Sequence, residues 1–546
     1  MESIGSLTKP LTYPYLQTSC TSWCINVESK SIAVPTSTIP AIPAEITHRP
    51  LGNWVAMQYS VRNVEWLRKV TKEKIPRPMH YLYKWPRPSH WQVMLHQRHM
   101  AEHFVYNKRA FNFSHMGTGK TASTIWATDY LMTVGQIKRV LVVCPKSVLH
   151  VWADELFALT PHRSAEIASA GSKRGSILSD TLLEYVVVNP DALKDHSETI
   201  VRSGFDAVVV DEQTYFKTWS SARTKALRYI QTKVPRLWMM SGSPMPQSPE
   251  DMYPPGRFIC DTDEGSTFPK TLTGFREKTM ICVNRGKFQE WKPRPGAVEM
   301  VAKMIGDKAI RYTLDECVDL PDTSYTTFKV DPAPAQKKAY DQLVKDGLSM
   351  VDDYGAIKAM NEAIVMTKCL QVAMGAVKFT NLQSGQDGVA EVDCQPKLDA
   401  LEDILTEADG PVIVFCPFIA PLNYIQQWLD KEKITYTRVD GGTAQTDRAH
   451  AFGSVQAGEV KVLLANPSAM AHGVTLTTSN QIVWWGLPYS RETYEQANAR
   501  IVRTGQKRKT HITHLTCLPV ESKVLDALQR KGELQGLLMS LIKGGK

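Results

Sequence analysis

The chain has 546 residues, and its 64 Lys and Arg against 55 Asp and Glu give a net charge of +9. This length predicts three to four domains, each large enough to bury a core without disulfide or metal staples. With 43% hydrophobic and 22% charged residues, the chain is neither disordered nor fibrous, and it is too long for a small binding module. No run of about 18 apolar residues occurs, so we expect no membrane contact, and the first residues lack the features of a secretory signal. The basic excess is a mild indication of a polyanionic partner.

Five segments are predicted along the chain. Residues 1–80, dotted with proline, indicate a small N-terminal accessory domain. In 81–250 and again in 386–520, short apolar runs alternate with helical patterns, which predicts two α/β domains with buried parallel sheets. Residues 251–385 between them are predicted to form a mostly helical insertion, and 521–546 a C-terminal helix. The predicted strands are Phe111–Phe113, Val140–Cys144, Tyr185–Val188, Ala207–Val210, Leu237–Met240, Val412–Phe415, Tyr436–Val439, Val460–Ala465, Ile482–Trp485 and His511–Leu515.

A glycine-containing loop follows the first predicted strand and reads Ser114-His-Met-Gly-Thr-Gly-Lys-Thr121. Between a strand and a helix, Gly117 and Gly119 let backbone N–H groups turn toward phosphate oxygens. Lys120 can then reach the β- and γ-phosphates of ATP, and the Thr121 hydroxyl can bind Mg²⁺. The loop departs from the usual phosphate-binding pattern at Ser114, where a first glycine is expected.

Two acidic residues, Asp211 and Glu212, end a buried apolar strand. Parallel sheets bind their ligands at the carboxyl ends of the strands. We therefore expect Asp211 to hold Mg²⁺ through water, and Glu212 to position or deprotonate the water that attacks the γ-phosphate. Acidic pairs are common on protein surfaces, but the apolar run directly before this pair argues against a surface position.

The order of these motifs resembles that of the superfamily 2 ATPases, and specifically the SNF2-like group, over roughly residues 88–520. Short proteins of this layout are familiar from tailed-phage genomes, and the chain resembles that phage-encoded kind. The resemblance rests on Met94–Gln97 (glutamine motif), Val140–Ser147 (motif Ia), Asp211–Lys217 (motif II), Ser241–Pro244 (motif III), Val412–Pro417 (motif IV), Asp440–Thr443, Leu463–Leu476 (motif V) and Gln496–Gln506 (motif VI).

This resemblance implies two tandem RecA-like domains that bind ATP between them. Arg500 and Arg503, whose spacing places them on one helix face, would meet the γ-phosphate when the cleft closes. They would complete a catalytic set with Lys120, Asp211 and Glu212. The remaining implied residues are Gln97, Met116, Gly117, Thr118, Gly119, Lys120, Thr121 and Gly473 for ATP, Thr121 and Asp211 for the metal, Thr214, Ser241, Ser243 and Gln496 for coupling, and Lys146, Ser147, Thr443 and Thr475 for the DNA backbone.

Motif II departs from the family pattern, because Thr214 stands where a histidine is expected. Threonine can still hydrogen-bond, for example to Ser241, but it cannot carry charge. This substitution bears on the coupling of hydrolysis to motion more than on hydrolysis. Four aromatic residues near motif VI, Trp484, Trp485, Tyr489 and Tyr494, are interpreted as core packing rather than as a platform for stacking bases.

These features predict a DNA-dependent ATPase that uses ATP and Mg²⁺ to translocate on double-stranded DNA and to remodel DNA or protein–DNA complexes. We expect it in the cytoplasm or nucleoid of a bacterial or phage-infected cell, with any protein partner bound through the N-terminal domain. Two alternatives stay open. One is a strand-separating or annealing helicase of the same superfamily, and the other is a nucleotide-gated DNA-binding scaffold with weak ATPase activity.

Overall fold

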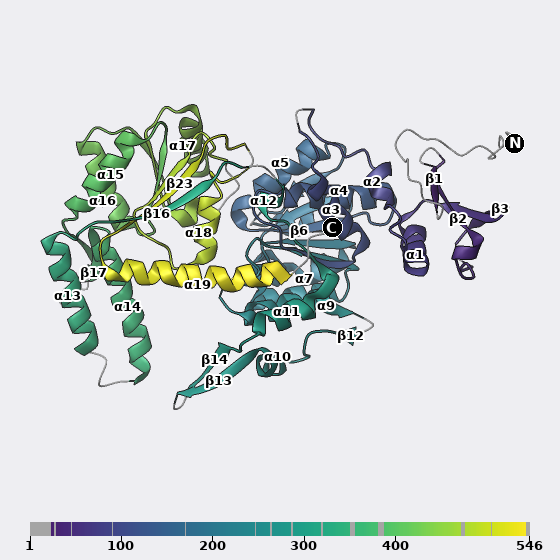
Figure 1. Cartoon of the computed structure of the whole chain (residues 1–546), viewed down its shortest axis with the longest axis horizontal. Coiled ribbons are helices and arrows are strands. Elements are labelled where there is room, and N and C mark those ends of the chain that lie inside the picture. The colour runs from purple at the N-terminus through teal and green to yellow at the C-terminus, as the bar shows by residue number, and fades with distance from the viewer. Residues whose placement is uncertain are drawn as a thin grey trace.

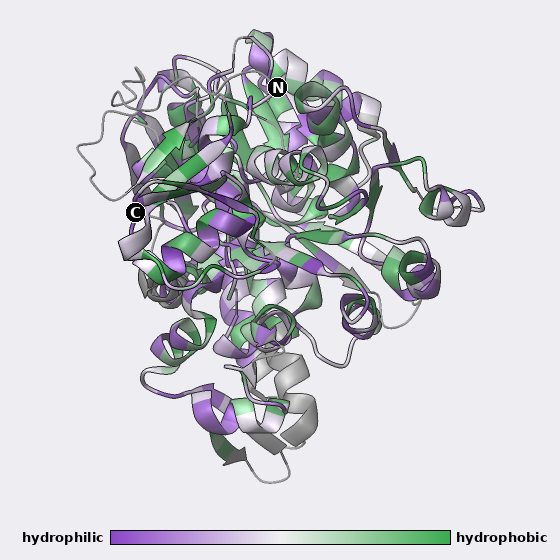
Figure 2. Ribbon diagram, turned by 90° about the vertical axis from the view of Figure 1, so that its right-hand side faces the viewer, coloured by the Kyte–Doolittle hydropathy of each residue, from purple (hydrophilic) through white to green (hydrophobic). Residues whose placement is uncertain are grey.

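The computed structural model describes residues 23–541, except 27–28, 45, 90, 170, 246, 263–264, 286–287, 318–319, 350–354, 381–386, 471–474 and 504. Two α/β lobes lie side by side, and a small β-rich module extends from the first lobe, away from the second (Figure 1). Hydrophobic residues follow the central strands, whereas the surrounding helices carry both hydrophobic and hydrophilic residues (Figure 2). Within the described ranges, no helix is long and apolar enough to cross a membrane.

The N-terminal module is a four-stranded antiparallel sheet with one helix packed against it. Its strands are β1 (Cys24–Asn26), β2 (Ser31–Pro35), β3 (His48–Leu51) and β4 (Trp54–Gln58), in the order β1-β2-β4-β3. Alternate residues of β2 and β4 are buried, as expected for a sheet with one covered face. Helix α1 (Val61–Thr71) begins at Ser60, whose hydroxyl accepts a hydrogen bond from the Asn63 N–H, and buries Val64 and Leu67 against the sheet. The short helix α2 (Pro78–Leu82) then leads into the first lobe.

The first lobe is built on a seven-stranded parallel sheet in the order β15-β5-β10-β9-β6-β8-β7. Successive residues of β9 pack in different hydrophobic clusters, Val208 and Val210 in one and Val209 in the other, so helices cover both faces. The strands are β5 (Arg109–Asn112), β6 (Val140–Val143), β7 (Ala165–Ile167), β8 (Tyr185–Val188), β9 (Ala207–Asp211), β10 (Arg236–Met240) and β15 (Ala309–Ile310). The helices are α3 (Leu95–Tyr106), α4 (Lys120–Thr133), α5 (Leu149–Leu159), α6 (Arg174–Ser179), α7 (Ala192–Arg202), α8 (Ala222–Gln231), α9 (Tyr253–Cys260), α10 (Leu272–Thr279) and α11 (Ala297–Ile305).

The middle segment, predicted as a mostly helical insertion, contributes a strand to each sheet. Strand β15 pairs with β5 in the first lobe, and β16 (Thr323–Lys329) pairs with β23 in the second. Around them lie the hairpins β11 (Asp261–Thr262)–β12 (Gly265–Ser266) and β13 (Met280–Arg285)–β14 (Phe288–Pro293), helix α12 (Leu314–Cys317), helices α13 (Pro334–Ser349) and α14 (Gly355–Ala373), and the hairpin β17 (Ala376–Thr380)–β18 (Asp387–Glu391). The β13–β14 hairpin projects from the first lobe, and α13 and α14 project from the second (Figure 1).

The second lobe is a six-stranded parallel sheet in the order β16-β23-β22-β19-β21-β20. Strands β19 and β21 are buried along their whole length, as expected for a sheet covered on both faces. Its remaining strands are β19 (Val412–Phe415), β20 (Tyr436–Val439), β21 (Val462–Ala465), β22 (Gln481–Trp484) and β23 (Thr510–Thr516), and its helices are α15 (Gln395–Glu407), α16 (Ile419–Lys431), α17 (Gln445–Ala457) and α18 (Arg491–Asn498).

The C-terminal helix α19 (Pro519–Leu541) connects the two lobes. Its first turn is fixed in the second lobe by an ion pair between the Lys397 ammonium and Glu521, 2.6 Å apart, with side chains only 0% and 1% exposed. The other oxygen of Glu521 accepts the N–H groups of Cys517 and Leu518, at 2.7 and 3.1 Å. From this anchor α19 runs toward the first lobe and lies beside α11 (Figure 1).

The predicted fold class of two parallel-sheet α/β units is confirmed, and all ten predicted strands form with ends that shift by at most two residues. The strands absent from the prediction are those of the N-terminal module, β7, β15, β16 and the strands of the three hairpins, β11–β12, β13–β14 and β17–β18. Most of β16 is exposed, since it is an edge strand, so its sequence lacks the apolar run by which buried strands are identified.

Candidate nucleotide site between the lobes

The phosphate-binding loop lies between β5 and α4, as predicted. Both Gly117 and Gly119 have positive φ, 80° and 82°, a backbone conformation that residues with a Cβ rarely adopt. The Lys120 ammonium donates hydrogen bonds to the carbonyls of Ser114 and His115, at 2.7 and 3.1 Å, and so closes the loop. Burial lowers the pKa of Lys120, although the negative charges of two nearby acids oppose this shift.

Ser114, the departure from the usual loop pattern, has a structural role. Its side chain is buried, and its hydroxyl accepts a hydrogen bond from the backbone N–H of Tyr312, at 3.0 Å. Tyr312 lies in the segment that joins β15 of the first sheet to β16 of the second. The hydroxyl therefore ties the phosphate-binding loop to the connection between the lobes, which a glycine could not do.

The glutamine motif packs directly against this loop. The Gln97 side chain accepts the Met94 N–H at 3.1 Å, and its amide lies so close to Gly119 that a Cβ at Gly119 would collide with it. Next to it, an imidazole nitrogen of His96 lies 3.0 Å from the Thr118 carbonyl. The two side chains fix the loop from the α3 side, and the predicted contact of Gln97 with adenine stays a prediction.

The two predicted acids lie at the carboxyl end of β9, facing Lys120. The Trp152 indole N–H donates to the Asp211 carboxylate at 2.8 Å, and burial raises the pKa of Asp211 against the opposing effects of Trp152 and Lys120. Glu212 has a φ of 67°, which is strained for a residue with a side chain and turns the chain sharply away from the strand. Burial, followed by the charges of Glu492 and Asp211, raises the pKa of Glu212.

Motif III and Thr214 meet at Glu212. One Glu212 oxygen accepts hydrogen bonds from the hydroxyls of Ser241, at 2.6 Å, and of Thr214, at 3.0 Å. The expected hydrogen bond between Thr214 and Ser241 is therefore replaced by a shared acceptor, because both short side chains point at the same carboxylate. Thr214 thus contacts the Glu212 carboxylate without the charge of a histidine.

Helix α18 of the second lobe approaches this group across the cleft. Ser243, whose N–H donates to the Ser241 hydroxyl at 3.0 Å, donates its own hydroxyl to Glu495 of α18 at 2.9 Å. Glu495 in turn accepts from Arg491 at 2.8 Å, and Arg491 donates to the Leu528 carbonyl of α19 at 3.2 Å. A continuous chain of hydrogen bonds thus links the Glu212 carboxylate to the C-terminal helix.

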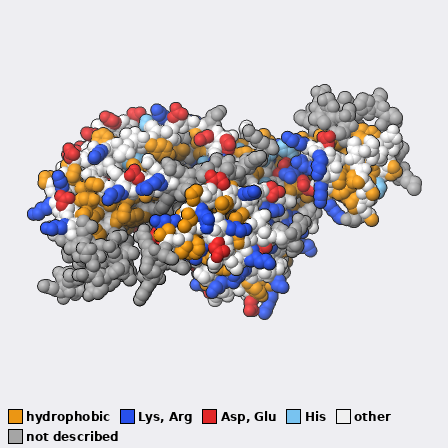
Figure 3. Space-filling model, turned by 60° about the horizontal axis from the view of Figure 1, so that its bottom comes forward, with side chains coloured by type: hydrophobic (Ala, Val, Ile, Leu, Met, Phe, Trp, Pro, Cys, Tyr) orange, Lys and Arg blue, Asp and Glu red, His pale blue; other side chains and the backbone are white. Residues whose placement is uncertain are grey.

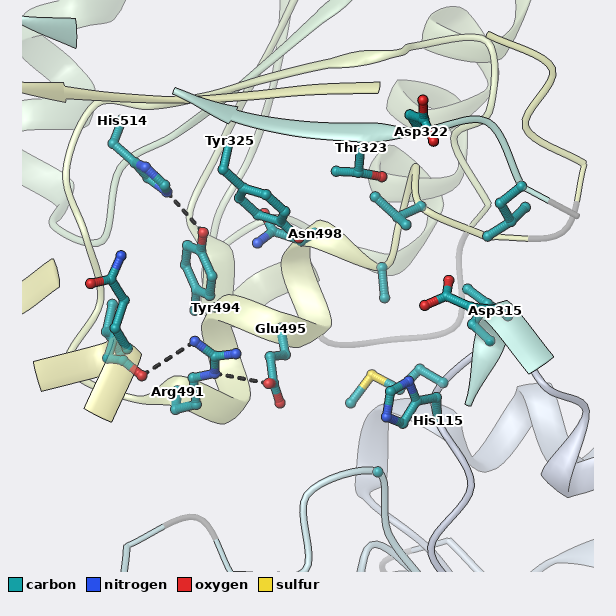
Figure 4. A pocket seen from close by; sticks show the side chains of 18 of the residues that line it. His115, Asp315, Asp322, Thr323, Tyr325, Arg491, Tyr494, Glu495, Asn498 and His514 are labelled. Atoms are coloured by element: carbon teal, nitrogen blue, oxygen red, sulfur yellow. Dashed lines mark hydrogen bonds and ion pairs between the residues drawn. The ribbon is translucent and has the colours of Figure 1, made fainter. Parts of the chain in front are cut away.

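A cavity of about 900 Å³ lies beside this chain, between the lobes. It is lined by His115 from the phosphate-binding loop, by Tyr325 of β16 and by Tyr494 of α18, whose hydroxyl lies 2.8 Å from the His514 ring. Figure 4 shows His115 on one side of the cavity and Arg491, Tyr494 and Glu495 on the other. Gln496, also predicted to take part in coupling, donates to Glu492 at 3.1 Å.

The two motif VI arginines follow α18 and do not lie on it, because the helix ends at Asn498. The prediction that they share one helix face is therefore wrong. Arg500 is only 6% exposed and donates to the Gln496 carbonyl at 3.0 Å, and burial together with Arg503 lowers its pKa to about 9. Arg503 lies against the phosphate-binding loop, since a Cβ placed on Gly117 would be 3.6 Å from the Arg503 Cβ.

The predicted DNA contacts lie on both lobes. Lys146 is exposed in a short 3-10 helix before α5, and the Ser147 side chain lies outside the described residues. In the second lobe the Thr443 hydroxyl accepts the Asp440 N–H at 2.9 Å, and Thr475 is half-buried. Gly473, predicted to contact ATP, also lies outside the described residues.

Comparison with known families decides the assignment. Residues 59–384 match the SNF2-related domain, and residues 396–505 match the helicase conserved C-terminal domain. The chain belongs to the SNF2-related family. The predictions of the family and of a helicase-like ATP hydrolase are thereby confirmed, while the roles of single residues stay predictions.

Relatives of this SNF2-related chain come from phages, bacteria and eukaryotes. It is 24% identical over 470 residues to protein p41 of Acyrthosiphon pisum secondary endosymbiont phage 1, covering 82% of the chain and 98% of the relative. It is 24% identical to the ATP-dependent helicase MG018 of Mycoplasma genitalium and 23% to the ISWI chromatin-remodeling complex ATPase CHR17 of Arabidopsis thaliana, over 77% and 78% of the chain. It spans only 39% and 40% of those two proteins. The solved SWI2/SNF2 ATPase core of Sulfolobus solfataricus in complex with dsDNA aligns with 83% of the chain and 94% of its own, at 19% identity and a TM-score of 0.40.

The residues that the sequence did not reveal are those whose hydrogen bonds join different helices, strands or loops. Glu495 and Arg491 stand next to or near Gln496, but nothing in the sequence indicates that they bridge motif III and α19. Tyr312 contributes a backbone N–H, which no side-chain motif can reveal. Of the predicted core aromatics, Trp484, Trp485 and Tyr494 are buried, whereas Tyr489 is exposed.

Proposed function

We propose that this SNF2-related chain is an ATP-driven motor that moves along double-stranded DNA and remodels DNA or protein–DNA complexes. The observation that carries the proposal is the hydrogen-bonded chain from Glu212 through Ser241 and Ser243 to Glu495. Because this chain of hydrogen bonds joins residues of the first lobe to α18 of the second, hydrolysis would depend on how the two lobes contact each other. The phage, bacterial and plant relatives support ATP use, and we place the protein in the cytoplasm of a bacterial host.

The residues around the loop fit the chemistry of ATP and Mg²⁺. Mg²⁺ prefers oxygen ligands and takes only one or two from protein when phosphates supply others, and Thr121 and Asp211 offer a hydroxyl and a carboxylate. When bound, the ion would neutralise charge that develops on the phosphates. Lys120 would hold the phosphates, and Glu212 would orient the attacking water and accept its proton. Arg500 and Arg503 would stabilise the transition-state charge, for which an arginine is worth about 10³–10⁵ in rate.

One structural feature favours a second candidate, a strand-separating helicase. The β13–β14 hairpin projects from the first lobe, and unwinding enzymes need an element that parts the strands. The nucleotide-gated scaffold has weaker support, because Thr214 still contacts Glu212 and Lys120 lies near Asp211 and Glu212.

The decisive experiment measures ATP hydrolysis without DNA, with single strands and with duplex. We expect stimulation by duplex, which Lys120→Ala abolishes and which the exposed lysine variant Lys108→Ala, in the same lobe, leaves intact. Hydrolysis that no nucleic acid stimulates would refute the motor. A translocase should displace a triplex strand without opening a forked duplex, whereas a helicase should open the fork. Removal of the 280–293 hairpin should reduce activity only if the protein is a helicase.

A further inference from the structure

The net charge of the chain is concentrated in one short segment. Residues 61–90 contain eight Lys and Arg against two Glu, a net charge of +6 out of the +9 of the whole chain. The 456 residues that follow contain 53 Lys and Arg against 50 Asp and Glu and are close to neutral. This basic segment comprises α1, α2 and the connection from the N-terminal module to the first lobe, and it contains none of the motor motifs.

Three of its arginines hold the module in place. Arg68 donates to the Ile75 carbonyl at 2.5 Å, and Arg87 donates to the Trp91 carbonyl at 2.7 Å. Arg77 donates to Glu65 at 3.2 Å, and its guanidinium lies 4.2 Å from the centre of the Tyr106 ring in the first lobe. These positive charges are committed to the fold.

The other five positive residues are Arg62 and four lysines, Lys69, Lys72, Lys74 and Lys84, and we call the four lysines the basic collar. All four are exposed, and in the part of the chain that the structure describes none forms an ion pair with an acidic residue. Figure 3 shows Lys and Arg side chains gathered where the module meets the first lobe. A collar of this kind forms a site of high positive potential that attracts polyanions.

We propose that the basic collar binds the phosphate backbone of duplex DNA outside the track of the two lobes, as a second, sequence-independent DNA contact; this inference rests on the proposed function. The surroundings favour a phosphate backbone over an acidic protein. Protein interfaces are built around an apolar core, but none of the large hydrophobic side chains exposed in the described chain lies between 61 and 90. Backbone contacts need only positive charge at the surface.

The collar is tested by the salt dependence of duplex binding in the full-length protein without nucleotide. The variant is Lys69→Gln, Lys72→Asn, Lys74→Gln and Lys84→Gln together, with Asn at position 72 because its φ of 60° is tolerated by that residue. Each lysine on a phosphate contributes about 0.9 to the slope of log K against log salt, so we expect the slope to fall by roughly 3 to 4. ATP hydrolysis without DNA should stay unchanged.

A matched control removes four exposed lysines from the second lobe: Lys337, Lys338, Lys431 and Lys523, each replaced by Gln. Equal slopes for the two quadruple variants would overturn the proposal, as would competition by polyglutamate as strong as that by unlabelled duplex. Because the experiment measures binding, its result does not depend on catalysis. ATP hydrolysis that DNA does not stimulate would refute the proposed motor function, whereas an unchanged salt slope would refute only the proposal that the basic collar binds DNA.

Discussion

The hydrogen bond from the Ser243 hydroxyl to Glu495 joins the two lobes, and Ser243→Ala removes it without adding bulk. Hydrogen bonds to charged groups contribute about 1.5–3 kcal/mol. The Glu495 side chain is 28% exposed, so water competes for it and the lower end of that range applies. About 1.5 kcal/mol corresponds to roughly a tenfold effect, and we expect duplex-stimulated kcat to fall by that factor. The KM for ATP should stay unchanged, because the Ser243 hydroxyl donates its hydrogen bond to Glu495 of α18.

The assay is steady-state ATP hydrolysis at saturating duplex for Ser243→Ala, Glu495→Gln and the double variant. If the two residues act through one contact, the second substitution adds little to the first. Ser220→Ala, an exposed serine of the same lobe, serves as the matched control. Fully additive losses, or a rise in KM with kcat unchanged, would show that the serine acts on nucleotide binding and that the reasoning is wrong.

Two further predictions concern stability. Lys397→Met leaves the Glu521 carboxylate buried without its cation, so we expect the free energy of unfolding of the second lobe to fall by about 3–5 kcal/mol, as measured by thermal or denaturant melting. The double variant Lys397→Met with Glu521→Gln should recover part of this loss. A loss under about 1 kcal/mol in the single variant would contradict the stabilising role of the ion pair. Burial lowers the pKa of His514 from about 6.5 in the unfolded chain to about 4 in the folded protein. Between these values the unfolded chain binds a proton that the folded protein does not bind. The free energy of unfolding is therefore unaffected by this histidine above pH 6.5 and falls by roughly 3 kcal/mol as the pH is lowered toward 4. His514→Gln should flatten the melting temperature over this pH range, and an unaltered pH profile would exclude the histidine as the cause.

The parallel strands of both lobes could be predicted because each is a short apolar run buried on both faces, such as Tyr185–Val188. Strand β16 and the strands of the N-terminal module could not, since exposed edge strands and one-sided sheets carry a weaker pattern. The spacing of residues also could not predict where helices end. Arg500 and Arg503 have helical spacing but lie after the end of α18.

Within the site, the residues whose chemistry is carried by the motif itself lie where they were predicted. Lys120, Asp211 and Glu212 meet at the carboxyl edge of the first sheet, because strand ends in a parallel sheet gather at one edge. The partners that set their environment come from remote segments. The prediction that Thr214 hydrogen-bonds to Ser241 named the wrong acceptor. Only the folded chain shows that both hydroxyls donate to Glu212.

The sequence alone determined the family and the two α/β lobes, and it indicated the candidate site residues, since local spacing and apolar periodicity encode strands, loops and motifs. It also contained the excess of positive charge in residues 61–90, but not the exposure of the four lysines of the basic collar. The tertiary structure decided which groups from remote segments touch: Ser114 with Tyr312, Ser243 with Glu495, and Lys397 with Glu521. Such contacts join residues 124 to 252 positions apart, and their geometry depends on how whole lobes pack, which no local pattern specifies.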